Sequence, residues 1–258
     1  MMKMTSLFVT AIIMIAPAAF AIAKDEGLAK AIAATHRTPA MVERDKVRKP
    51  QEVLEFFGIK PTLTVVEISP GAGYWTEMLA PYLKGTGTYY AAVGRAEAFR
   101  KKLGADPAVY GEVKLVEMAP GTEIAPAGSA DLVLTFRNVH NWMSNGTADQ
   151  VFEGFFKSLK PGGVLGVEEH RANTSQPQDP QAKSGYVRED YTIQLAEKAG
   201  FKLVGKSEIL ANPRDTKDYP KGVWTLPPSL AMGETDRAKY VAIGEADNFL
   251  LKFQKPQK

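Results

Sequence analysis

The chain has 258 residues, with 32 lysines and arginines against 29 aspartates and glutamates, a formal net charge of +3 and no cysteine. The absence of cysteine excludes disulfide bonds, cysteine-ligated zinc and thiol nucleophiles. Because the net charge is small and spread along the chain, we expect no binding to nucleic acid. The length fits one α/β domain with additions rather than two independent domains.

Residues 1–23 have the pattern of a secretory signal peptide. Lys3 precedes an apolar run over residues 7–16, and a proline and several small residues follow. The small-x-small cleavage rule is met twice, so we expect cleavage after Ala21 or Ala23. The alternative is an uncleaved membrane anchor, but the interrupted apolar run is shorter than the roughly 20 residues of a membrane span. We therefore expect a periplasmic or secreted protein without stable membrane insertion after cleavage.

Residues 24–60 are predicted to form an N-terminal helical arm, and residues 61–258 the main domain. The last helix of the arm is expected to end at Gly58, a residue type that favours the helix C-terminus. A charged stretch of the arm allows two interpretations, in which it either faces a pocket or forms a solvated face with local ion pairs. This stretch contains Arg44, Asp45 and Arg48.

A buried strand over residues 62–68 is predicted to run into a glycine turn and then a helix. The strand is rich in β-branched residues, and the helix has an apolar stripe beginning at Trp75. Gly71 and Gly73 leave backbone N–H groups at the helix start open to a negatively charged ligand group. The alternative is a tight connection without a ligand. The turn does not match the G-x-G-x-x-G motif of nicotinamide-binding proteins, because Thr76 stands at the third glycine position.

A second strand is predicted over residues 88–93, a helix over 95–103 and a third strand over 113–118. This strand-helix order is typical of a parallel sheet. Nucleoside-binding α/β folds usually have a carboxylate at the end of the second strand, where it holds the ribose hydroxyls. This chain has none after Val93, and Glu97 lies one helical turn further on. Either Glu97 or a water replaces this contact, or the affinity for a ribosyl cofactor is reduced.

A fourth buried strand, residues 131–136, ends in a dense group of polar and aromatic residues. The C-terminal ends of strands line the ligand crevice of an open α/β sheet. The group is therefore expected at the same pocket as the glycine turn; it comprises Arg137, Asn138, His140, Asn141 and Trp142. His140 is either a general base, with an unperturbed pKa of about 6.5, or a structural histidine satisfied by nearby backbone. We expect no metal site, because the three histidines, His36, His140 and His170, do not pair at ligand spacing.

The C-terminal half is predicted to contain a capped helix, three further strands and a long insert. Thr147 and Gln150 resemble a capping box, and the helix ends at the Leu-Lys-Pro-Gly-Gly stretch of residues 159–163. Two carboxylates precede His170 on the next strand, and at most one can join it on a given face because neighbouring residues alternate. Residues 210–246 form a long polar insert before a last strand over 248–255, and its aromatic residues are candidates to cover a substrate.

Residues 65–75 resemble motif I of the class I S-adenosylmethionine-dependent methyltransferases. Glu67 stands in the acidic place, Gly71 and Gly73 in the last two glycine places, and Ser69 in the first. The stretch over 159–163 resembles the turn before the fifth strand of these proteins. The order of parts over residues 40–255 is similar to a group of exported predicted methyltransferases. This resemblance implies a Rossmann-like, doubly wound, seven-stranded and mostly parallel sheet with an antiparallel last strand.

The resemblance further implies S-adenosylmethionine as the cofactor, and the methyl acceptor is an unidentified small molecule or another acceptor. It places the cofactor against Glu67, Ser69, Gly71, Gly73, Tyr74, Glu117, Met118 and Arg137. For Glu117, the alternative is the polar end of a buried strand. Catalytic roles fall to His140 first, with Asn138 and His170 beside it. The missing carboxylate after Val93 favours a second hypothesis, a non-catalytic periplasmic small-ligand-binding protein on this fold; a nicotinamide oxidoreductase is the third. The motifs specify neither the acceptor nor the oligomeric state.

Overall fold

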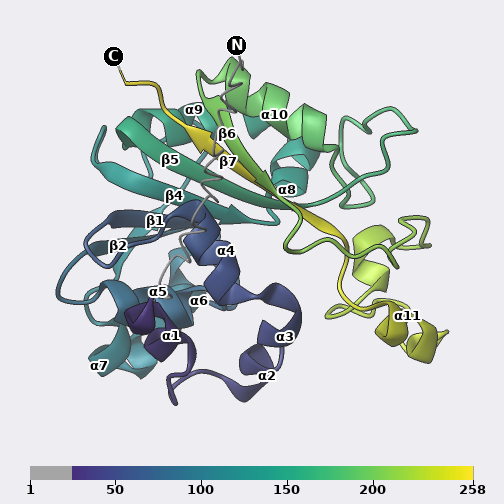
Figure 1. The fold of residues 1–258 in the computed structure, drawn as a ribbon, viewed down its shortest axis with the longest axis horizontal. Helices are drawn as coiled ribbons and strands as arrows, with labels where there is room; N and C mark the ends of the chain where they lie inside the picture. Colours follow the sequence, from purple (N-terminus) through teal and green to yellow (C-terminus); the bar gives the residue numbers. More distant parts are fainter. Residues whose placement is uncertain (1–24, 258) are drawn as a thin grey trace, which may run out of the picture.

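A computed structural model describes residues 25–257, and the predicted signal peptide lies outside this range. The described residues form a seven-stranded sheet in the order β3-β2-β1-β4-β5-β7-β6, in which β7 runs antiparallel to both neighbours (Figure 1). This order confirms the predicted fold class. The strands are β1 Thr64–Ile68, β2 Thr88–Val93, β3 Lys114–Glu117, β4 Ala130–Phe136, β5 Leu159–His170, β6 Lys202–Ser207 and β7 Asn248–Gln254.

Helices cover both faces of the sheet. They are α1 Glu26–Ile32, α2 Pro39–Val42, α3 Asp45–Arg48, α4 Pro50–Phe57, α5 Thr76–Leu83, α6 Ala96–Ala105, α7 Pro107–Tyr110, α8 Val139–Ser144, α9 Ala148–Ser158, α10 Glu189–Lys198 and α11 Arg237–Ile243, with a 3-10 turn η1 at Gly222–Thr225. Figure 1 shows α9 and α10 on one side, and α1, α5 and α6 on the other. Val65 and Val66 are fully buried in two different cores, because successive strand residues point to opposite faces.

Several boundaries differ from the sequence-based expectation. The predicted capping box is wrong, because no side chain caps α9 and the Thr147 hydroxyl instead donates to the Trp142 carbonyl at 3.4 Å. Strand β5 begins at Leu159, immediately after α9, rather than at 164. Residues 159–163 thus belong to the strand, and a register irregularity against β4 between Ala130 and Leu132 accommodates them. The predicted end of α4 is confirmed, since Gly58 is left-handed there with φ 84°.

The insert over residues 210–246 is built around a small core of its own. Buried side chains from η1 and α11, Val223 and Tyr240, pack with Tyr186 and Leu226. In Figure 1 it extends beyond one end of the sheet, with α11 at its far edge. The predicted insert therefore contains regular structure, η1 and α11. No helix within residues 25–257 is long and apolar enough to cross a membrane.

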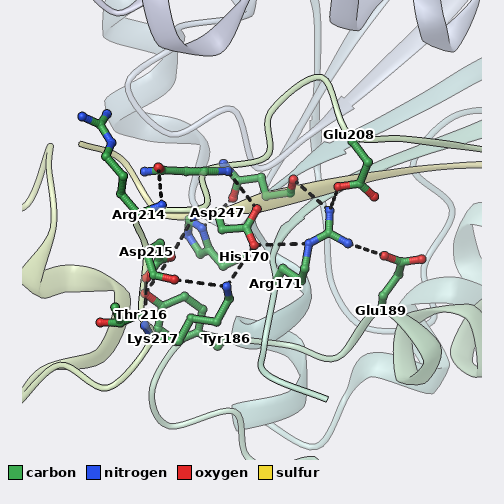
Figure 2. Close-up of polar contacts among 12 residues, drawn as sticks. His170, Arg171, Tyr186, Glu189, Glu208, Arg214, Asp215, Thr216, Lys217 and Asp247 are labelled. Carbon is green, nitrogen blue, oxygen red and sulfur yellow. Dashed lines mark hydrogen bonds and ion pairs between the residues drawn. The ribbon is translucent and has the colours of Figure 1, made fainter. Parts of the chain in front are cut away.

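Two buried aspartates anchor the insert to the sheet (Figure 2). Asp215 accepts hydrogen bonds from the Tyr186 hydroxyl at 2.9 Å and from the backbone N–H of Asp247 at 2.8 Å. Asp247 in turn pairs with Lys217 at 3.0 Å and with Arg171, at the end of β5, at 3.3 Å. Because each buried carboxylate has several donors, the insert is held in a fixed position against the strand ends.

Candidate functional site

A cavity of about 300 Å³ lies at the C-terminal ends of β1 and β4. The arm closes one side of the cavity and the insert another. Two residues other than glycine adopt a left-handed backbone conformation at these strand ends, Ser69 with φ 48° and Arg137 with φ 60°. Strained backbone of this kind gathers at functional sites. The sequence prediction that the two strand ends share one pocket is confirmed, since Ser69, Arg137 and His140 all line the cavity.

The end of β1 presents a buried carboxylate with one free oxygen. Glu67 is 1% exposed, and its Oε2 accepts hydrogen bonds from the hydroxyls of Thr76, at 2.8 Å, and Tyr89. Its Oε1 has no partner among the described residues. Burial raises the pKa of Glu67 to about 7 despite these two hydrogen bonds. Beside it, Gly71 has φ 58°, and a Cβ there would meet no atom within 4 Å, so its backbone faces open space.

Three predicted cofactor contacts lie away from this cavity. A Cβ on Gly73 would overlap the side chain of Lys102, whose ammonium pairs with Glu77 at 2.9 Å. Glu117 is exposed at the end of β3, Met118 is half-buried, and neither lines the cavity. The structure therefore groups the motif I residues Glu67, Ser69 and Gly71 with the end of β4. The predicted contacts of Glu117 and Met118 with the cofactor stay a prediction.

A cluster of arginines faces the cavity around one carboxylate of the insert. Glu245 pairs with Arg44 at 2.9 Å, Arg48 at 3.3 Å and Arg137 at 3.0 Å. Burial alone would raise the pKa of Glu245, but the nearby arginines lower it below its usual range. Arg48 is itself buried, which lowers its pKa to about 10. The structure thus divides the charged arm between the two interpretations: Arg44 and Arg48 face the cavity, whereas Asp45 forms a local ion pair with Arg37 at 2.6 Å.

Aromatic side chains cover the same cavity. Trp75 stacks on Phe136 with ring centroids 4.1 Å apart, and both line the cavity. Tyr74 also lines it, under the Arg48 guanidinium, which lies 4.6 Å from the ring centroid. From the insert come Trp224 and two prolines. Trp224 of the insert thus lines the cavity, and the role of the insert's aromatic residues in covering a substrate stays a prediction.

His140, at the start of α8, has a carboxylate partner that the sequence analysis did not identify. Its Nδ1 lies 3.0 Å from Oε1 of Glu169, and its backbone N–H donates to Oε2 at 3.2 Å. Burial lowers the pKa of His140, but the attraction and hydrogen bond of Glu169 outweigh it and raise the pKa above its ordinary value. The same contacts hold the pKa of the buried Glu169 below its ordinary value, although burial opposes this. The pair is therefore an ion pair over part of the pH range.

The two adjacent glutamates of β5 point to opposite faces, as the alternation predicts. Glu169 contacts His140, whereas Glu168 lies 3.6 Å from Arg137 on the other side. His170 lines the cavity and its Nδ1 lies 2.8 Å from Oδ1 of Asn248. Burial lowers the pKa of His170 to about 3, so this ring is neutral at physiological pH. A sequence signal for the His140–Glu169 pair was absent, because 29 residues separate them.

Asn138 lines the cavity, but its side-chain amide serves the fold. Its Nδ2 donates to the backbone carbonyls of Ile68 and Phe136, each at 3.2 Å, and so ties the ends of β1 and β4 together. This contact positions the two strand ends, and the predicted catalytic role of Asn138 stays a prediction. The premise that no histidines pair is also corrected, since donor atoms of His140, Glu169 and His170 lie within 4.8 Å of one another.

Neither a protein-family model nor a curated protein sequence matches the chain. Solved structures do match. A SAM-dependent methyltransferase from Aquifex aeolicus is 16% identical with a TM-score of 0.58, over 88% of this chain and 98% of that one. The cyclase SpnF is 15% identical with a TM-score of 0.60, over 90% and 93%. A putative sarcosine dimethylglycine methyltransferase from Galdieria sulphuraria is 11% identical with a TM-score of 0.58, over 86% and 90%. The order of the strands and the similarity to these solved structures show that this chain has the fold of the class I S-adenosylmethionine-dependent methyltransferases.

Proposed function

We propose that this protein is an exported S-adenosylmethionine-dependent methyltransferase that acts on a polar small molecule. The observation that carries the proposal is that two groups of residues line the same cavity. The β1 corner supplies a buried carboxylate and an open glycine turn, Glu67 and Gly71, and the β4 end supplies His140 with its partner Glu169. The fold and its similarity to solved methyltransferase structures support this assignment.

The residues of the β1 corner fit the amino-acid end of the cofactor. The Oε1 atom of Glu67 has no partner among the described residues and can accept a hydrogen bond from a donor group of a ligand. Without a ligand, a buried oxygen atom that has no partner is unfavourable. The open backbone at Gly71 permits close approach. When bound, S-adenosylmethionine supplies an electrophilic methyl group on a sulfonium. The described residues contribute binding, orientation and proton transfer.

In this proposal, His140 accepts the proton that the acceptor loses. Ionised Glu169 only accepts hydrogen bonds, so the Nδ1 of neutral His140 carries its proton and Nε2 is free to take another. Glu169 then stabilises the imidazolium that forms. Much of the rate enhancement comes from holding the acceptor in line with the methyl group. Trp75 and Phe136 limit the access of water on one side and Trp224 on another.

Calorimetry on mature protein, residues 24–258, tests the cofactor assignment. We expect S-adenosylmethionine and its demethylated product to bind, and NAD not to bind. Gly71→Val should abolish this binding, because a branched side chain would enter the space that the ligand needs. Gly85→Val is the matched control, since Gly85 has a similar left-handed backbone, φ 76°, and equally open space but lies far from the cavity in a turn. Binding retained in Gly71→Val, with an intact circular dichroism spectrum, contradicts the placement.

One observation favours a second function, that of a non-catalytic small-ligand-binding protein. No carboxylate follows β2 directly, and Glu97 and Glu117 are exposed outside the cavity, so a ribose-binding contact is missing from the described site. One structural neighbour, SpnF, is a cyclase, which agrees with the presence of other activities on this fold. If the wild type binds neither S-adenosylmethionine nor its product, this second function replaces the first.

A further inference from the structure

Two histidine rings lie beside each other on the cavity wall. His140 comes from α8 and His170 from the end of β5, and their ring centroids are 5.6 Å apart with an angle of 31° between the planes. Both residues line the cavity, whereas Glu169 lies behind them and is fully buried. The edge of Trp224 contacts His140 from the insert, with centroids 5.9 Å apart.

Each ring is fixed through its Nδ1 by an oxygen atom. Glu169 Oε1 lies 3.0 Å from Nδ1 of His140, and Asn248 Oδ1 lies 2.8 Å from Nδ1 of His170. Because these oxygens accept, each Nδ1 donates a proton and each Nε2 keeps its lone pair. This is the arrangement of metal-binding histidines, which almost always donate the other ring N–H to an oxygen acceptor.

We propose that His140 and His170 bind a divalent transition metal ion through their Nε2 atoms, with Glu169 as the outer carboxylate of the site. The two rings line the cavity with their centroids 5.6 Å apart, so both face the space where one ion would lie. Metal–nitrogen bonds of about 2.0–2.1 Å require the two Nε2 atoms to lie within about 4 Å of each other in the loaded site. The remaining coordination positions face the cavity and belong to water or to a ligand.

The electrostatic surroundings are compatible with a cation. Three arginines line the cavity, Arg44, Arg48 and Arg137, and all three are paired with Glu245. Arg137 also lies 3.6 Å from Glu168. Imidazole nitrogen suits zinc, copper, iron and nickel, whereas magnesium and calcium prefer oxygen ligands.

The metal site goes beyond methyl transfer and does not depend on it. An ion on Nε2 of His140 takes the lone pair that would otherwise accept a proton. It would instead bind an oxygen of the cavity ligand and lower the pKa of a bound hydroxyl group. The class of ligand that this favours is a small molecule with a hydroxyl or another oxygen donor.

Metal titration of the untagged mature protein tests the proposal after treatment with EDTA. We expect one Zn²⁺ per chain by calorimetry, competition by Co²⁺ with a visible absorption band, and no competition by Mg²⁺. His140→Ala and His170→Ala should each abolish this binding. Glu169→Gln should weaken it by roughly 10- to 100-fold, the usual effect of an outer partner. His36→Ala is the matched control, because the His36 ring binds the Glu77 carbonyl away from the cavity and should keep full affinity.

A second measurement on the wild type keeps the test independent of variants that fail to fold. Long-range nitrogen-proton spectra of the histidine rings should show that Zn²⁺ shifts the Nε2 signals of two rings. The proposal is overturned by the absence of saturable binding at one ion per chain, by binding that survives in the His140→Ala/His170→Ala double variant, or by shifts confined to Nδ1. Cofactor binding measured in EDTA reports separately on the proposed methyltransferase function.

Discussion

Glu169 holds His140 through both of its carboxylate oxygens, one on the ring Nδ1 at 3.0 Å and the other on the backbone N–H at 3.2 Å. The same carboxylate accepts the backbone N–H of His170 at 2.8 Å. A fully buried glutamate thus fixes the orientation of the ring, the start of α8 and the end of β5 together. This arrangement gives His140 a defined tautomer and links its protonation to the charge of Glu169.

The pH dependence of turnover should reveal this link. A base acts in its neutral form, so turnover should rise with pH through the pKa of His140, which Glu169 raises above 6.5. Glu169→Gln removes the negative charge, and the inflection should therefore move to lower pH while burial continues to favour the neutral ring. Rate profiles of both proteins in EDTA measure the inflections. An inflection that stays in place, or moves to higher pH, would exclude His140 as the group that titrates.

Removing the imidazole tests its role in proton transfer. His140→Ala should lower turnover by roughly 10²- to 10⁴-fold, the usual contribution of a general base. Its affinity for S-adenosylmethionine should change little, because Glu67 and Gly71 hold the cofactor in the proposed arrangement. In EDTA, His170→Ala should lower turnover less, since His170 is neutral and bound to Asn248. Lost cofactor binding in His140→Ala would instead place this ring against the cofactor, and unchanged turnover would make it structural.

The fold was predictable because local patterns encode it. The β-branched run before Gly71 and the apolar stripe after it correspond to β1 and α5, and all five stripe residues are buried: Trp75, Met78, Leu79, Tyr82 and Leu83. Boundaries were less predictable where tertiary contacts compete with local ones. Thr147, for example, meets the Trp142 carbonyl instead of capping α9.

The location of the site could be predicted from the sequence, but the pairs of residues that interact within it could not. Residues after β1 and β4 were expected at one pocket because parallel strands end at the same edge of a sheet. Contacts between segments that are distant along the chain leave no local pattern in the sequence. Two contacts of the site are of this kind. Glu169 meets His140 across 29 residues, and Glu245 meets Arg44 across 201. Lys102 likewise occupies the space beside Gly73 from a neighbouring helix, which motif spacing cannot anticipate.

Export is tested by the mature N-terminus. A precursor expressed with residues 1–23 should give periplasmic protein that begins at Ile22 or Lys24, because the apolar segment is short and the cleavage rule is met twice. Mass spectrometry of the periplasmic fraction measures this directly. Intact Met1 on cytoplasmic protein would contradict export.

Glu245→Gln should destabilise the protein strongly. It removes the carboxylate that compensates Arg44, Arg48 and Arg137, and loss of one partner of a buried ion pair typically costs about 3–5 kcal/mol. Urea denaturation measures the free energy of unfolding. Glu43→Gln is the control, because its pair with Lys46 is exposed and such pairs contribute about 0–1 kcal/mol. Equal effects of the two substitutions would show that the cluster does not stabilise the closed cavity.

Glu67 should make stability depend on pH in a defined window. Burial raises its pKa from 4.5 to about 7 in the folded protein, so the folded state holds one more proton than the unfolded state between these values. Stability from this group is therefore fully present below pH 4.5, falls as the pH rises, and is lost above about pH 7. The full loss is at most about 3.5 kcal/mol, since each pKa unit corresponds to about 1.4 kcal/mol.

Glu67→Gln imitates the protonated form and removes this titration. The variant should gain stability relative to the wild type as the pH rises from 4.5 to 8, because the wild type must bury a charge and the variant does not. Urea midpoints at pH 4.5, 6 and 8 measure the difference, with the exposed Glu97→Gln as the control. A constant difference across the window would show that Glu67 is ionised throughout. Bound S-adenosylmethionine should raise the stability of the wild type at pH 8 more than that of the variant, because a donor on Oε1 stabilises the carboxylate form.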